Sequence, residues 1–149
     1  MAKYSAAMIA EWFLYYNRLM MRESGADLIS NLKLQKLLYY AQGCYLAIKD
    51  QPLFDEPIVA WDHGPVVEEV YRIYRSNRSN GIQYDEDFNE NIDPETTDIL
   101  KQVYSVFGQY SAWGLRNMTH QELPWINTQR NAEISQESIK QYFKEHYVE

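Results

Sequence analysis

The chain has a single cysteine, Cys44, among its 149 residues. One thiol cannot form a disulfide within the chain, and it excludes a metal site built from several cysteines. No run of 18 apolar residues occurs, which argues against a membrane-spanning helix. The N-terminus also lacks the basic, apolar and small-residue order of a signal peptide. We therefore expect a cytoplasmic protein that has no contact with a membrane and needs no cofactor.

Positive charge is scarce, and the shortage is uneven along the chain. The net charge is −7, and residues 76–149 alone carry 6 basic against 12 acidic side chains. An acidic surface repels phosphate backbones, so binding to nucleic acid by this chain alone is not expected. A basic partner, attracted by the acidic half, is the alternative that the charge leaves open.

Recognisable catalytic motifs are also missing. The sequence contains no His-Glu-x-x-His, glycine-rich phosphate loop, Gly-x-Ser-x-Gly or cysteine–histidine pairing. His63 and His120 could meet beside Asp62 or Glu122 and form a metal or acid–base site, which would make the protein a hydrolase or metal-dependent enzyme. The spacing does not require this, since both imidazoles could instead hold loops by hydrogen bonds. We predict that the protein is not an enzyme, and we assign no catalytic or metal-binding residue.

The strongest helical pattern runs from Ser30 to about residue 49. Ser30 is a suitable N-cap, and apolar residues follow at steps of three and four, which predicts a buried stripe. The members of this stripe are Leu34, Leu37, Leu38, Ala41, Tyr45 and Ile48. A second stripe consists of Lys33, Lys36, Tyr40 and Gly43. It is interpreted either as a solvated face or as a surface for a partner, and in both cases it should be exposed.

The remaining periodicity predicts one compact, mainly α domain over residues 1–149, with about six helices and a small two-stranded β element. The other helices are expected over residues 4–23, from residue 66 to about 75, from Pro94 through at least Phe107, from residue 112 to about 122, and after Ser135. Residues 58–61 are expected to be extended and to pair with residues 81–84. Asp62-His63-Gly64-Pro65 is expected to form a corner that starts a helix, with Pro65 in its first turn.

Several short motifs, taken in this order, resemble the Panacea domain family of SocA-like antitoxins and GepA-like phage-associated proteins. They are Leu34-Gln35-Lys36-Leu37-Leu38-Tyr39-Tyr40-Ala41-Gln42-Gly43, Pro52-Leu53-Phe54, Ile58-Val59-Ala60-Trp61, His63-Gly64-Pro65-Val66-Val67 with Tyr71, and Thr119-His120 with Pro124-Trp125. The resemblance implies a mostly helical domain encoded by prophages, mobile elements and bacterial chromosomes. It further implies an antitoxin that neutralises a cognate protein toxin by binding it. In SocA-like members it also implies an adaptor that presents the toxin to the ClpXP protease. No catalytic residues are implied.

The residue patterns and the resemblance together predict a partner-binding surface. Tyrosine and tryptophan are abundant in this chain, and both dominate protein-recognition sites. The predicted partner-binding residues are Lys33, Lys36, Tyr40, Trp61, His63, Gly64, Pro65, His120 and Trp125. The predicted partner is the toxin, with ClpXP as a second partner if the chain is an adaptor.

Overall fold

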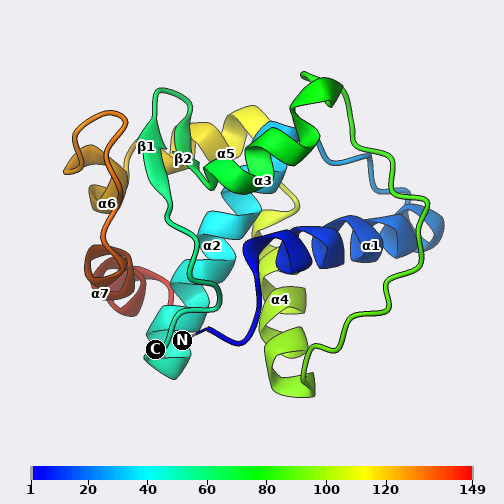
Figure 1. Ribbon diagram of the computed structural model, residues 1–149, viewed down its shortest axis with the longest axis horizontal. Coiled ribbons are helices and arrows are strands. Elements are labelled where there is room, and N and C mark those ends of the chain that lie inside the picture. The colour runs from blue at the N-terminus through cyan, green and yellow to red at the C-terminus, as the bar shows by residue number, and fades with distance from the viewer. Residues whose placement is uncertain (1, 149) are drawn as a thin grey trace.

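The computed structural model describes residues 2–148, which form seven α-helices, a short 3₁₀ turn and one two-stranded sheet (Figure 1). The elements are α1 (Ala6–Ser24), α2 (Asn31–Lys49), β1 (Val59–Trp61), β2 (Gly64–Val66), α3 (Glu68–Tyr74), η1 (Arg75–Asn77), α4 (Pro94–Phe107), α5 (Ala112–Thr119), α6 (Leu123–Ile126) and α7 (Gln136–His146). A mainly α fold with a small β element is therefore confirmed. Within the described residues, none of the helices has the length and apolar character needed to cross a bilayer.

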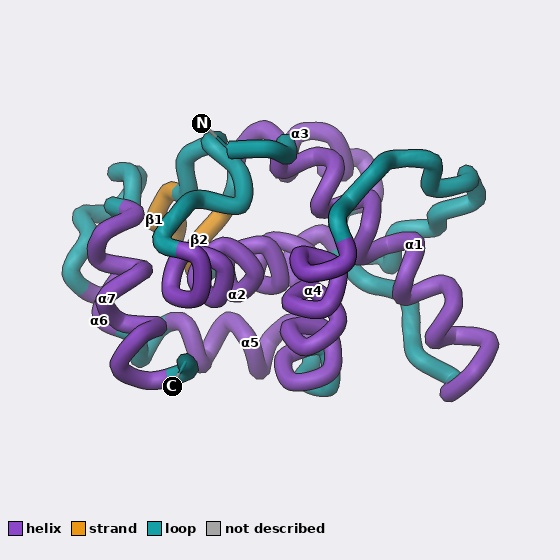
Figure 2. Tube along the Cα trace, turned by 90° about the horizontal axis from the view of Figure 1, so that it is seen from below, coloured by secondary structure: helices purple, strands orange, loops and turns teal. Residues whose placement is uncertain are grey.

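Helix α2 lies at the centre of the molecule. It contacts α1, α3, α4, α5, α7 and β2, and Figure 2 shows it between the β hairpin and α5. The predicted apolar stripe is buried from Leu34 to Tyr45, whereas Ile48 is exposed. Because neighbours surround α2 on most sides, its polar positions are buried as well, and a helix in that setting has little free face.

The helix boundaries follow local capping chemistry. The side chains of Ser30, Asp93, Ser111 and Ser135 each accept a hydrogen bond from a first-turn backbone N–H, as the sequence predicted. Gly25 ends α1 in the left-handed region, with φ of 73°. Ser5, which was not identified as a cap, is the N-cap of α1. The helix therefore begins at Ala6 and not at residue 4 as predicted.

The β element differs from the prediction. β1 pairs with β2 through an Asp62–His63 turn, so Pro65 lies in a strand and the third helix begins only at Glu68. Gly81 bridges Ser30 instead of β1. A two-residue hairpin has a far smaller loop-closure cost than a pairing across twenty residues, which explains why the local partner prevails. The short helix α6 also lies between residue 122 and Ser135, where no helix was predicted.

Three of the four residues in the second stripe of α2 are inside the protein and Lys33 is half-buried, so the prediction of an exposed face is wrong. Lys36 and Tyr40 have no exposed surface, and Gly43 is buried against α7. A Cβ atom on Gly43 would lie 2.4 Å from the Phe143 ring. The glycine therefore permits the close approach of α2 and α7, which explains its place in the middle of a helix.

Replacing this glycine tests the packing. We expect Gly43→Ala to lower the free energy of unfolding by about 1–3 kcal/mol, because the new methyl group would overlap the Phe143 ring. Alanine favours an isolated helix over glycine by about 1 kcal/mol, so helix propensity alone predicts the opposite sign. Urea denaturation followed by circular dichroism measures the change. In a Phe143→Leu background the same substitution should cost less, and a stabilising effect in the wild type would contradict the packing.

Candidate functional site

Two glutamine side chains of α2 form hydrogen bonds with backbone groups of segments that are distant in the sequence. The side-chain oxygen of Gln35 accepts from the Val67 N–H at 2.9 Å. Gln42 accepts from the Leu53 N–H at 2.8 Å and donates to the Phe54 carbonyl at 2.8 Å. Both glutamines are buried, and a buried amide needs such partners. The chain on both sides of the hairpin is therefore fixed to the central helix.

Lys36 fixes the hairpin itself. Its ammonium group donates to the Pro65 carbonyl at 2.8 Å, and full burial, followed by the nearby charge of Arg116, lowers the pKa of Lys36 to about 7. Gly64 has φ of 109°, and a Cβ there would lie 2.7 Å from Thr119 Oγ1 and 2.8 Å from Lys36 Cε. Lys36, Gly64 and Pro65 therefore shape the site from inside, and Lys36 cannot touch a partner in this conformation.

A buried carboxylate fixes the junction of α5 and α6. Glu122 is 2% exposed and accepts hydrogen bonds from the hydroxyls of Tyr39 and Tyr40, both at 2.9 Å, and of Tyr147. Burial raises the pKa of Glu122, while the three hydroxyl donors act in the opposite direction. Tyr40 was predicted to face a partner. It belongs instead to a network that joins α2, the α5–α6 junction and the end of α7.

Trp125 connects this junction to the hairpin. Its indole N–H donates to the Trp61 carbonyl at 2.8 Å. The His120 ring stacks on the Trp125 ring with centroids 4.0 Å apart, and the Arg130 guanidinium lies 3.6 Å from the centre of the same ring. Partial burial and the charge of Arg116 lower the pKa of His120, so the imidazole is neutral at physiological pH.

The outer end of the hairpin meets α5. Nε of Arg116 donates to Nδ1 of His63 at 3.3 Å, and the Arg116 guanidinium lies 4.3 Å from the centre of the Trp113 ring. Trp113 is 54% exposed. The hairpin carries two groups of contacts, one of His63, Arg116 and Trp113 and one of the Trp61 carbonyl, Trp125 and Arg130. We use the term aromatic–arginine surface for these six residues together.

The structure divides the predicted site residues into two groups. Trp61, His63, His120 and Trp125 come together around the hairpin, whereas Lys36, Tyr40, Gly64 and Pro65 are buried beneath it. Lys33 is half-buried, and its ammonium group donates to the Gly108 carbonyl at 2.7 Å.

Three residues of the surface were not identified from the sequence: Trp113, Arg116 and Arg130. Trp113 and Arg116 are three positions apart after the Ser111 cap, which places them on one helix face. That spacing could have identified Trp113 and Arg116 from the sequence. Arg130 lies in a loop, where no comparable spacing exists.

The geometry does not assemble the acid–base site that the histidines could have formed. His63 is engaged by Arg116, His120 stacks on Trp125, and the Glu122 carboxylate accepts three hydroxyl donors. No set of three histidine, cysteine or acidic residues within positions 2–148 is arranged to hold a metal ion. The arrangement is a surface rich in tryptophan and arginine, residue types that are enriched at protein interfaces.

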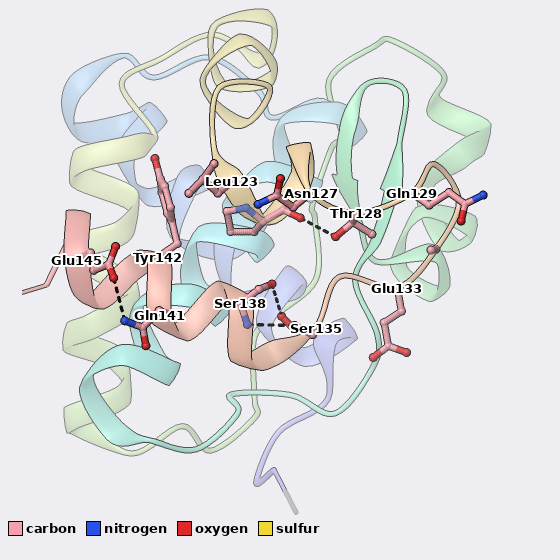
Figure 3. Close-up of a pocket in the computed structure, with 12 residues that line it drawn as sticks. Leu123, Asn127, Thr128, Gln129, Glu133, Ser135, Ser138, Gln141, Tyr142 and Glu145 are labelled. Atoms are coloured by element: carbon pink, nitrogen blue, oxygen red, sulfur yellow. Dashed lines mark hydrogen bonds between the residues drawn. The ribbon is translucent and has the colours of Figure 1, made fainter.

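A separate groove of about 560 Å³ lies between α6, the following loop and α7 (Figure 3). Its lining is mixed, with Leu123 and Tyr142 beside several short polar side chains. Several of these polar residues form hydrogen bonds with one another or with other residues of the lining: Thr128 with Pro124, Ser138 with Ser135, and Gln141 with Glu145. The groove therefore presents few convergent polar groups to a ligand.

Comparisons with known proteins match the central part of the chain to a protein family. The model of the family described as "Antitoxin SocA-like, Panacea domain" matches residues 34–126, more than half of the chain. Antitoxin SocA of Caulobacter vibrioides (strain NA1000 / CB15N) is 45% identical over 62 residues. That alignment covers 41% of this chain and 33% of the relative, so the chain spans about a third of the curated relative's length. No solved structure matches the chain.

Removal of the buried carboxylate tests the network beneath the surface. We expect Glu122→Ala to lower the free energy of unfolding by about 2–4 kcal/mol, because it leaves the hydroxyls of Tyr39 and Tyr40 buried without an acceptor. The exposed neighbour Gln121 provides the control, and Gln121→Ala should change the value by less than about 0.5 kcal/mol. Chemical denaturation at pH 7 measures both. Equal effects would show that the network contributes little to stability.

The buried ammonium group predicts a pH dependence of stability. The pKa of Lys36 is about 7 in the folded protein and 10.5 in the unfolded chain, so between these values the unfolded chain binds more protons. The free energy of unfolding of the wild type should therefore rise with pH from about 7 to about 8.5, relative to Lys36→Met, by up to about 1.4 kcal/mol per pH unit. Denaturation of both proteins across this range measures the difference. Parallel pH profiles would contradict a lowered pKa.

Proposed function

Because the chain belongs to the SocA-like Panacea domain family of antitoxins, we propose that it is the antitoxin of a toxin–antitoxin pair and neutralises a cognate protein toxin by direct binding. The observation that carries this proposal is the family match over residues 34–126, which includes the hairpin, α5 and Trp125. The 45% identity to Antitoxin SocA supports the same role. On this proposal, the protein acts in the cytoplasm, and its gene lies beside the toxin gene in a phage or mobile element.

The aromatic–arginine surface is the proposed point of contact. Tryptophan and arginine are the residues most enriched among those that dominate binding energy at protein interfaces. Here they are held by buried groups: Lys36 fixes the hairpin, and Trp125 is hydrogen-bonded to it. A surface fixed before binding loses little conformational entropy when a partner docks, which favours affinity. The proposed mechanism therefore needs no catalytic group.

Delivery of the toxin to ClpXP is the alternative mode of action. Direct neutralisation requires only a stable complex, whereas an adaptor requires the protease. The two modes therefore differ in a measurable way. Under direct neutralisation the toxin stays at its normal level and is inactive, while under adaptor action its level falls only in cells that contain ClpXP.

Co-expression with the product of the adjacent gene tests the proposal. We expect the wild type to restore growth and to copurify with that protein. Trp113→Ala should weaken the complex about 10-fold or more, because a large exposed aromatic is lost from the centre of contact. Ile73→Ala is a matched control, since Ile73 is 53% exposed on α3 against 54% for Trp113. It should change affinity by less than about 2-fold.

The outcomes distinguish the alternatives. Absence of both rescue and complex would reject the antitoxin role. Rescue that disappears in a strain without ClpX, together with restored toxin levels, would replace direct neutralisation by adaptor action. Equal effects of Trp113→Ala and Ile73→Ala would place the contact elsewhere on the protein.

A further inference from the structure

We propose that the aromatic–arginine surface binds an acidic segment of the toxin, with a carboxylate paired to Arg116 and an apolar side chain packed on Trp113. This inference rests on the proposed function and names the chemistry of the partner, which neither the family nor the relative specifies. The net charge of −7 alone would predict a basic partner, and the proposed partner segment is acidic.

The first support is the scarcity of acidic residues in α5 and α6, beside which the hairpin contributes one exposed carboxylate, Asp62. Residues 102–132, which include α5 and α6, contain one acidic residue, Glu122. Glu122 is 2% exposed, and its oxygens accept three tyrosine hydroxyls. The same stretch carries Arg116, His120 and Arg130. Residues 102–132 therefore carry two arginines, Arg116 and Arg130, and no exposed carboxylate.

The second support is the state of Arg116. Its guanidinium lies over the Trp113 ring at 4.3 Å, and Nε donates to His63 while Nη1 donates to Asn117 at 3.0 Å. Within residues 2–148 no carboxylate forms an ion pair with Arg116, and Nη2 has no acceptor. A planar guanidinium that is already oriented and still has free donors is suited to a carboxylate.

The electrostatic environment agrees with this geometry. Burial lowers the pKa of Lys36 and of His120, and the charge of Arg116 lowers both pKa values further. The contribution of Arg116 is repulsion between positive charges, so Lys36 and His120 lie within reach of its charge. An incoming carboxylate would relieve that repulsion.

An exposed apolar side chain lies beside the arginine. Trp113 is 54% exposed, and large aromatic rings that stay exposed often mark interaction sites. Trp113 lies directly beside Arg116, so one partner segment can meet an aromatic ring and a guanidinium together. A segment that alternates acidic and apolar residues fits these neighbours.

Two other occupants fit less well. A nucleic acid would need several phosphate contacts, and the surface offers two arginines in a chain of strongly negative charge. A second copy of this chain would have to bring its own acidic loop at residues 85–90, yet that loop is held in place by Arg18, which donates to the Tyr84 and Glu86 carbonyls. Both occupants are outcomes of the test.

The first experiment measures affinity for the adjacent gene's product by isothermal titration calorimetry. Arg116→Glu should weaken the complex about 10-fold or more, and Arg116→Gln by a smaller factor. Arg75→Glu is the matched control, because Arg75 is exposed in η1 and the same charge is reversed away from the surface. It should change affinity by less than about 2-fold. Circular dichroism and the indole N–H signals of Trp61 and Trp125 establish that each variant is folded.

A second experiment does not depend on the toxin. A synthetic peptide of alternating glutamate and leucine should shift the indole signal of Trp113 saturably in the wild type and not in Arg116→Glu. The corresponding lysine–leucine peptide should leave that signal unchanged.

The two experiments separate the inference from the proposed function. A toxin complex that is as tight with Arg116→Glu as with the wild type would overturn the inference and leave the antitoxin role intact. Failure of the toxin to bind, with the glutamate–leucine peptide still bound at Trp113, would reject the antitoxin role and retain the acidic specificity. Failure of both ligands would overturn the inference. Dimerisation of the chain through Trp113, or equal binding of a single-stranded oligonucleotide, would also overturn it.

Discussion

The fold depends on how a central helix satisfies polar groups that it buries. A carboxylate inside a protein is costly unless donors surround it, and Glu122 obtains three of them from Tyr39, Tyr40 and Tyr147. If the Glu122 carboxylate moved away, the buried hydroxyls of Tyr39 and Tyr40 would lose their hydrogen-bond acceptor. The junction of α5 and α6, the end of α7 and the centre of α2 are therefore bound to one another by a requirement of hydrogen bonding as well as by apolar contact.

The same principle transmits order from the interior to the surface. The Lys36 ammonium group has the Pro65 carbonyl as its acceptor, and Gly64 leaves no room for a side chain between Lys36 and Thr119. The hairpin is thus held from beneath, and it in turn accepts the Trp125 indole N–H at the Trp61 carbonyl. The exposed rings and guanidinium groups consequently stand on a scaffold of buried hydrogen bonds, which is the arrangement that allows a recognition surface to be rigid.

The sequence predicted those features that depend on neighbouring residues. The caps at Ser30, Asp93, Ser111 and Ser135 and the apolar stripe of α2 are local signals, and the structure confirms them. It did not predict the burial of Lys36 and Tyr40, because their partners Pro65 and Glu122 are 29 and 82 residues away in the chain. A lysine and a tyrosine at helical spacing look the same whether water or a distant carbonyl satisfies them. Pro65 was misplaced for a related reason, since a proline after a glycine suits both the start of a helix and the edge of a strand.

The same distinction bears on what a family resemblance conveys. Most of the motif residues on which the resemblance rests are buried, including Gln35, Lys36, Tyr39, Tyr40 and Gln42. Their hydrogen bonds hold the hairpin, the turn after α2 and the α5–α6 junction, so the motifs specify a scaffold. Trp113 and Arg116 lie outside those motifs and at the surface, where a substitution alters recognition with little effect on folding. Under the proposed function, the shared motifs would therefore maintain the common scaffold, and exposed residues outside them would determine which toxin is bound.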